Sequence, residues 1–397
     1  MKKKVLIIGA GFLQRYVIKK AKMLGYYTLA IDGNPNAIGL ADADESAVVD
    51  IVDQEACLEY ARKHKIDGVM TAATDYGVLS TAYVAAQLKL PAIDYNVAKT
   101  IKNKFLVRQC LYEVKADDTG LSHEVTDESN LEQLARCMSY PVMIKPCDGS
   151  GSRGASKVDN VTDFMCACKN ALNQSLSRRA TVEPFIEGKE YGVESFVVDG
   201  QIHVLGIMRK WMTQPPYYAE LGHAIPSGLS VDTENKVVNC VKKAINALNI
   251  RFGSVNMDII ITDKESVHII DIGARMGGNL IGSHIIPLGT GIDYIDNLIR
   301  ATVGDPYDFT PGDHANAVAS RLLALKPGVI KELPDMSSYA SVNTTIEHHL
   351  FEGKQINEYR TNLDGCGYVV CTDISVEHAE RKAEMIRKQI DDRIIRV

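Results

Sequence analysis

Two aspartates in the segment MDIIITDKESVHIID, Met257 to Asp271, are spaced for holding a metal ion. Two apolar runs flank a short polar turn, so the segment predicts a β-hairpin. A turn centred between Lys264 and Glu265 places Asp258 directly opposite Asp271, with Cβ atoms about 5 Å apart. Like charges destabilise such a pair, so a cation is predicted, and carboxylates beside phosphate oxygens favour Mg²⁺. The alternative is an exposed face on which both acids meet water, but the strands are otherwise apolar on both faces, which favours the metal.

A basic side chain follows the hairpin at once. Arg275 lies in the turn GARMGGN, whose guanidinium and open backbone amides are suited to anions. A second candidate anion contact lies in MIKPCDGSGSRGA (residues 143–155), where an apolar run carries Lys145 into proline and a loop of small residues. The commonest phosphate-binding loop has its glycines before the lysine, so the order here is different. A lysine at a strand end with flexible backbone beyond it still predicts a phosphate contact.

A third candidate segment is TVEPFIEGKEYGVE, residues 181–194. Phe185 and Ile186 can supply an apolar slot and main-chain groups for a purine, and Glu190 can accept hydrogen bonds from ribose hydroxyls. The alternative is an ordinary turn with surface acids. His223 lies in a long aromatic segment that holds the only tryptophan, and loops of this length are usually functional or mobile. It is a candidate phosphate or substrate contact, or simply a surface histidine.

The N-terminal stretch IIGAGFLQRY is similar to the G-x-G-x-x-G dinucleotide fingerprint. Gln14 stands where the third glycine belongs, and Asp32 ends the next predicted strand at the usual ribose position. An incomplete fingerprint favours a structural or substrate-facing turn over a nicotinamide site.

The elements that must position these residues change along the chain. Residues 1–96 alternate short β-rich runs with helical stretches, which predicts a Rossmann-like parallel sheet covered by helices. Residues 97–305 interleave helices and strands, with a lid subdomain at about 115–190. Residues 306–397 have the pattern of a small C-terminal α/β domain. The predicted fold class is therefore multidomain, with α/β and α+β parts.

Composition excludes several classes of function. The chain has 397 residues, enough for two or three domains, and a net charge of −6, which is unsuited to a nucleic-acid partner. No apolar run approaches the ~20 residues of a membrane span. The nine cysteines include no C-x-x-C pair, which indicates reduced, mostly buried thiols in a cytoplasmic protein.

Taken in order, these segments resemble the ATP-grasp superfamily of carboxylate–amine ligases. The branch they resemble holds phosphoribosylglycinamide synthetase, purine carboxylases, carbamoyl-phosphate-synthase-like enzymes and L-amino acid ligases. The resemblance runs over nearly the whole chain and is carried by NKFLVRQCL, YPVMIKPCDGSGSRGA, VEPFIEGKEYGVE and MDIIITDKESVHIIDIGARMGG. It implies an ATP-grasp fold behind a Rossmann-like domain. The chain departs from the family in having Asp at both metal positions, where Glu is usual, and Gly273 where many members have Asn.

The resemblance also implies roles for individual residues. Lys104 and Lys145 would contact the ATP phosphates, and residues 150–154 would close over these phosphates as a lid. The implied nucleotide-binding residues are Lys104, Lys145, Ser150, Gly151, Ser152, Gly154, Glu183, Phe185, Ile186, Glu190 and Met257. The implied catalytic residues are Arg275, Lys145 and His223. The implied ligands of Mg²⁺, with Mn²⁺ as a substitute, are Asp258, Asp271 and Asn279.

The implied activity is ATP-dependent ligation of a small-molecule carboxylate and an amine through an acyl phosphate, with ADP and phosphate as products. Arg153, Trp211–Pro216 and Asp75–Tyr76 would face the substrates, and the resemblance allows a homodimer. Three alternatives remain open. They are an ATP-grasp enzyme of purine biosynthesis, a catalytically inactive ATP-binding protein and an NAD-dependent dehydrogenase.

Overall fold

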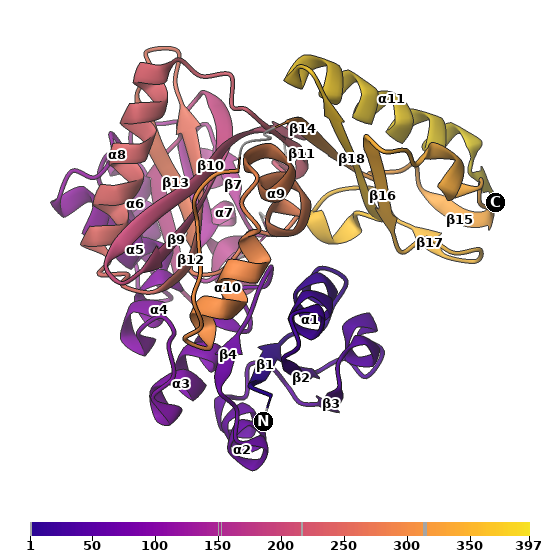
Figure 1. The fold of residues 1–397 in the computed structure, drawn as a ribbon. Coiled ribbons are helices and arrows are strands. Elements are labelled where there is room, and N and C mark those ends of the chain that lie inside the picture. Colours follow the sequence, from indigo (N-terminus) through magenta and orange to yellow (C-terminus); the bar gives the residue numbers. More distant parts are fainter. Residues whose placement is uncertain (1, 150, 152, 216, 313–315) are drawn as a thin grey trace.

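The computed structural model describes residues 2–149, 151, 153–215, 217–312 and 316–397. Within these residues the strands form four β-sheets, which Figure 1 shows from indigo at the N-terminus to yellow at the C-terminus.

The first sheet is parallel and buried by helices, as the strand–helix alternation predicts. Its strand order is β3-β2-β1-β4, and every pairing in it is parallel. The strands are β1 (Lys4–Ile8), β2 (Tyr27–Asp32), β3 (Glu45–Val48) and β4 (Gly68–Met70). The helices are α1 (Gln14–Met23), α2 (Gln54–His64) and α3 (Val78–Leu88). Alternate residues of β1 pack into different cores, which is the pattern of a strand covered on both faces.

An eight-stranded sheet forms the centre of the molecule, in the order β13-β12-β9-β10-β11-β14-β18-β16. Its strands are β9 (Lys189–Val198), β10 (Gln201–Met212), β11 (Glu220–Ile225), β12 (Gly253–Ile261), β13 (Val267–Gly273), β14 (Ala317–Leu322), β16 (Thr344–His348) and β18 (Gly367–Asp373). The hairpin between β9 and β10 turns at Asp199-Gly200, both at positive φ, because that turn geometry favours this dipeptide.

Helices cover this central sheet on both sides (Figure 1). On one side α8 (Val231–Ala247) packs with α4 (Tyr95–Ile101) and α5 (Lys104–Glu113) against β9, β12 and β13. On the other side α9 (Ile286–Thr290) and α10 (Tyr294–Thr302) join the core that includes α1. The first and central sheets are therefore packed through shared apolar residues.

A four-stranded antiparallel sheet stands apart from the centre with a core of its own, in the order β5-β8-β6-β7. Its strands are β5 (His123–Val125), β6 (Val142–Pro146), β7 (Ser156–Val158) and β8 (Ala180–Pro184), and its helices are α6 (Leu131–Cys137) and α7 (Val161–Gln174). We call this unit the lid sheet.

The last segment of the chain both extends the central sheet and adds a small sheet. Its strands β14, β16 and β18 belong to the central sheet, while β15 (Gly328–Glu332), β17 (Gln355–Ile356) and β19 (Ile395–Arg396) form the fourth. Helix α11 (Val376–Arg393), capped by Ser375, lies over β14 and β18. The domain limits predicted from the sequence remain predictions.

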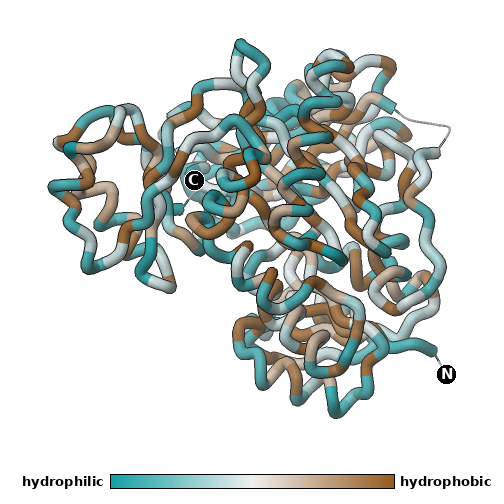
Figure 2. The backbone as a smooth tube through the Cα atoms, turned by 90° about the vertical axis from the view of Figure 1, so that its left-hand side faces the viewer, coloured by the Kyte–Doolittle hydropathy of each residue, from teal (hydrophilic) through white to brown (hydrophobic). Residues whose placement is uncertain are grey.

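Hydrophobic and hydrophilic stretches alternate along the backbone in short runs (Figure 2). In the described part of the chain, no helix is both long enough and apolar enough to cross a bilayer. All nine cysteines are free and six of them are buried, in agreement with the predicted reduced thiols.

Candidate active site

A cavity of about 1030 Å³ lies between the central sheet and the lid sheet, and it reaches the loop before β18. Most of the predicted site residues line it. These are Lys104, Lys145, Gly151, Glu183, Phe185, Ile186, Glu190, His223, Asp258, Asp271, Arg275 and Asn279. Residues as distant in sequence as Lys104 and Asn279 therefore line the same cavity.

The two aspartates face each other as predicted, but for a different local reason. Asp258 of β12 pairs with Asp271 of β13. The turn is centred on Lys264, because Thr262 donates to the Ser266 carbonyl, so the predicted symmetry about Lys264–Glu265 is wrong. A β-bulge at Ile270 adds one residue to β13, which restores the opposition of the two acids.

Each aspartate is held by a lysine. The Lys104 ammonium donates to Asp271, and the Lys210 Nζ lies 2.9 Å from Asp258 Oδ1. Among the described residues, no group of three or more His, Cys, Asp or Glu is arranged to hold a metal ion alone. Two opposed carboxylates with phosphate oxygens beside them fit Mg²⁺, which keeps few protein ligands and completes its shell with phosphate and water.

Lys145 is fixed over the hairpin from the lid sheet. Its Nζ donates to the Ile270 carbonyl at 2.7 Å and lies 2.9 Å from the Glu183 carboxylate. The bulge at Ile270 therefore also helps to position Lys145, because the Ile270 carbonyl accepts its hydrogen bond. Glu183 is committed to Lys145, so its contribution to the adenine slot would be indirect, through the position of the lysine.

The predicted apolar slot forms, with one correction. Phe185 and Ile186 line the cavity together with Ile260 of β12, and the Lys157 ammonium lies 4.8 Å from the Phe185 ring centre. Met257 does not take part. Successive side chains of a strand point to opposite faces, so Asp258 and Ile260 face the cavity while Met257 is fully buried among the residues that pack on α8.

The lid loop is partly described. Ser150 and Ser152 lie outside the described residues. Gly151 lines the cavity at φ +62°, where a side chain would be strained. Gly154, at φ +73°, does not line it: an added Cβ would come within 2.8 Å of the Gln174 side chain, so this glycine serves packing rather than phosphate contact.

Arg275 forms an ion pair with Asp75, in the loop that follows strand β4 of the first sheet. Its Nε and one terminal nitrogen each lie 3.1 Å from an oxygen of Asp75, in a bidentate pair. Burial acts to lower the pKa of Arg275, but the neighbouring Asp75 outweighs it and raises the pKa. Next to Asp75, Tyr76 accepts a hydrogen bond from Arg153 of the lid loop. The two arginines near the expected phosphate position are thus both held by the loop after β4.

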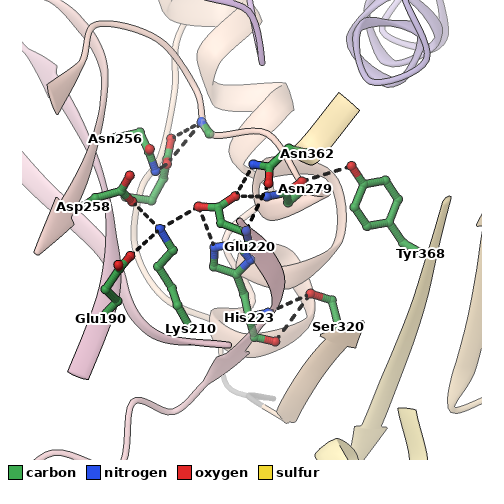
Figure 3. Close-up of polar contacts among 12 residues, drawn as sticks. Glu190, Lys210, Glu220, His223, Asn256, Asp258, Asn279, Ser320, Asn362 and Tyr368 are labelled. Carbon is green, nitrogen blue, oxygen red and sulfur yellow. Dashed lines mark hydrogen bonds and ion pairs between the residues drawn. The ribbon is translucent and has the colours of Figure 1, made fainter. Parts of the chain in front are cut away.

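A polar cluster that the sequence did not reveal lines the same cavity next to Asp258 (Figure 3). Glu220 of β11 accepts hydrogen bonds from Asn279 and from Asn362, the latter at 2.8 Å, and pairs with Lys210 at 2.6 Å. The Asn279 side chain also accepts from the Tyr368 hydroxyl at 3.0 Å. Asn279 lies on the far side of Glu220 from Asp258, so its predicted role as a metal ligand is not supported by its place.

His223 lies in the wall of the cavity rather than on a surface loop. It belongs to β11, is 1% exposed, and its Nε2 is 3.8 Å from Glu220 Oε1. Burial lowers its pKa to about 4, against the opposing effect of Glu220 and with Lys210 and Arg321 lowering it further. The imidazole is therefore neutral at neutral pH and would act as a hydrogen-bonding group, not as a cation for phosphate.

This burial predicts an acid-sensitive contribution to stability. Because the folded pKa lies below that of an unfolded histidine, the unfolded state binds more protons between about pH 6.5 and pH 4. We expect about 2 kcal/mol of unfolding free energy to be lost through His223 between about pH 7 and pH 5. Urea unfolding of wild type and His223→Gln at both pH values measures it. The variant should lose less stability on acidification, and an equal loss in both proteins would contradict the prediction.

The polar groups around the N-terminal glycine turn (Gly9–Gly11) form hydrogen bonds with other residues of the chain. The Asp32 carboxylate accepts from the backbone N–H groups of Ala10 and Asn34, and the Gln14 side chain donates to the Ala72 carbonyl. An added Cβ at Gly11 would lie 2.9 Å from Gln14 Oε1. These contacts favour the structural interpretation of the turn over a dinucleotide site.

Comparisons with known proteins agree with this geometry. Residues 138–283 match the protein family described as the ATP-grasp domain. The chain is 23% identical over 283 residues to the formate-dependent phosphoribosylglycinamide formyltransferase of Prochlorococcus marinus (strain MIT 9515), covering 67% of this chain and 68% of that protein. The solved phosphoribosylglycinamide synthetase from Anaerococcus prevotii has a TM-score of 0.80 at 23% identity, and both chains are covered completely. The L-amino acid ligase from Bacillus licheniformis has a TM-score of 0.83 at 20% identity, covering 100% and 99%.

The family match spans the lysine of β6, the lid loop, the central strands and the aspartate hairpin, and the fold likeness spans the whole chain. The resemblance inferred from the ordered motifs is confirmed. Residues 138–283 therefore match the ATP-grasp domain family, and the whole chain shares the fold of the two solved enzymes named above.

Proposed function

We propose that this chain is an ATP-dependent carboxylate–amine ligase that works through an acyl phosphate. The observation that carries the proposal is the opposed pair Asp258–Asp271 in one cavity with Lys104, Lys145 and Arg275. Two acids can hold the metal ion of a metal–triphosphate, and the cations near them can neutralise its phosphate oxygens. The relatives named above, which carry the names of ligases and a formyltransferase, support the same class of reaction.

The chain's own residues would bind and orient rather than form bonds, since phosphoryl transfer demands little covalent chemistry from the protein. Lys104 and Lys145 would neutralise phosphate oxygens. Arg275, whose guanidinium is oriented by its bidentate pair with Asp75, would donate to the oxygens of the transferring phosphoryl group. Mg²⁺ held by Asp258 and Asp271 would stabilise negative charge on the phosphate oxygens as a Lewis acid.

The lid sheet would then exclude water. A carboxylate oxygen attacks the γ-phosphorus, ADP leaves, and the amine displaces phosphate from the acyl carbon as it gives up a proton. An acyl phosphate hydrolyses if water reaches it, so the lid sheet would have to stay closed over the cavity between the two steps. The identity of the substrate pair and a homodimeric assembly stay predictions.

Ligand-dependent melting tests the nucleotide class. We expect Mg-ATP at saturating concentration to raise the melting temperature by several degrees, because a ligand that binds only the folded state stabilises it, and NADH to have no effect. ADP release should then appear only when a carboxylate and an amine are both present, in a screen of amino acids, dipeptides and phosphoribosylamine-type compounds.

The outcomes separate the alternatives. Stabilisation by NADH alone would overturn the ligase assignment in favour of a dehydrogenase. Stabilisation by Mg-ATP without ADP release from any pair in the screen would favour an inactive ATP-binding protein.

A further inference from the structure

Lys210 is a buried lysine in the middle of the cavity cluster, and no role follows for it from the sequence. It lies on β10, its side chain is 1% exposed, and its ammonium is surrounded by carboxylates (Figure 3). Its Nζ lies 2.6 Å from Glu220, 2.9 Å from Asp258 and 3.4 Å from Glu190. An ammonium has three N–H donors, so each acid has a donor to itself.

The three acids come from three strands and face different parts of the cavity. Asp258 of β12 is one of the two proposed metal ligands, and Glu190 of β9 is the proposed ribose contact. Glu220 of β11 is fixed by Asn279 and Asn362 at the end that reaches the loop before β18. One ammonium therefore contacts the acids on the proposed nucleotide side of the cavity and the acid on the side that reaches the loop before β18.

Charge explains why a cation is needed at this point. Three carboxylates in a poorly solvated pocket repel one another strongly, and an unpaired buried charge is costly. A compact point charge on a flexible stem can serve three acids from different directions, which a planar guanidinium cannot do equally well. The Lys210 ammonium lies between these three acids, so the side of Asp258 that faces Asp271 is the one left for an ion.

We propose that Lys210 is a positioning residue that acts as a built-in cation: it takes the place of a second divalent ion between Asp258, Glu190 and Glu220. It fixes the positions of these three carboxylates relative to one another. It also limits the site to one divalent ion per bound nucleotide. The inference rests on the proposed function for its meaning in the reaction. Cation binding, however, is measured without turnover, so an experiment can contradict the role of Lys210 without contradicting the proposed ligase function, and the reverse.

The decisive variant is Lys210→Met, which keeps the length of the stem and removes the charge. We expect it to bind Mn²⁺ in the absence of nucleotide at least about tenfold more tightly than wild type, as followed by the free-Mn²⁺ resonance signal. Lys210→Arg keeps a positive charge and should gain no such binding. The exposed Lys189 of β9 supplies the matched control, and Lys189→Met should equal wild type. A Lys210→Met protein with unchanged Mn²⁺ affinity would overturn the proposal.

Two further measurements guard against a variant that folds poorly. If Lys210→Met melts at a lower temperature, Mn²⁺ alone should restore much of the loss, since the ion would replace the missing ammonium. A loss that Mn²⁺ cannot reverse counts against the proposal. In wild type with ADP, one Mn²⁺ per chain is expected, and two would refute the idea that Lys210 excludes a second ion. Absence of ADP binding would instead contradict the proposed function and leave the nucleotide-free test standing.

Discussion

Asp271→Asn is expected to lower kcat for ADP release by about a thousandfold. The change keeps the shape of the side chain, including an oxygen for the Ile272 N–H at 2.9 Å, and removes only the charge. It weakens the proposed metal position and leaves Lys104 without its carboxylate partner. Loss of several kcal/mol of charge stabilisation on transferring phosphoryl oxygens corresponds to about three powers of ten in rate.

The hairpin supplies its own control for this change. Asp263 lies in the exposed turn of the same hairpin, so Asp263→Asn alters the same residue type without touching the cavity. Coupled ADP assays over a range of Mg²⁺ and Mn²⁺ should leave Asp263→Asn at wild-type rate. An Asp271→Asn enzyme within about tenfold of wild type would refute the assignment of the aspartate pair.

Lys145→Met is expected to lower kcat/KM for ATP by about a hundredfold or more. Removing one preorganised donor that faces developing charge typically has an effect of this size. The variant also leaves the Glu183 carboxylate without its ion pair and the Ile270 carbonyl without its donor. Some loss of stability is therefore expected beside the loss of rate, because a buried acceptor without a partner costs about 1–3 kcal/mol.

Two comparisons separate rate from stability. Lys169 lies exposed on α7 of the same lid unit, and Lys169→Met should change neither the melting temperature nor the rate. The double variant Lys145→Met/Glu183→Gln removes the stranded acid, so it should recover stability but not turnover. Recovery of turnover in the double variant would show that Lys145 acts only by pairing with Glu183.

Much of the site could be predicted because its parts are local. The face of each side chain follows from strand alternation, and the two apolar runs around a polar turn predict the hairpin that carries Asp258 and Asp271. Alternation also corrects Met257, which stands between two cavity-facing residues and so must face the helices. The turn centre was predicted one half-residue out, and the bulge at Ile270 compensated, since bulges depend on what the extra carbonyl can contact.

Other contacts had no signal in the sequence. The pair Arg209-Lys210 reads as two basic residues in one strand, and only the packing of α11 and of the cavity shows which way each points. Arg209 pairs with Glu377 and Glu380 of α11, while Lys210 enters the cavity. Asn279 was expected at the metal, and its partner Glu220 lies about sixty residues away in sequence, so no spacing rule connects them.

The sequence by itself determined the hairpin that carries the two acids, the order of the segments that hold Lys145, the lid loop and Phe185, and the parallel first sheet. Each of these depends on residues that are neighbours along the chain or on the two-residue period of a strand. Only the tertiary structure decided that Asp75 holds Arg275, that Lys210 gathers three acids, and that Asn362 reaches Glu220. Those contacts join strands and loops far apart in the chain, and their partners are chosen by the order of strands in the sheets and by packing between them.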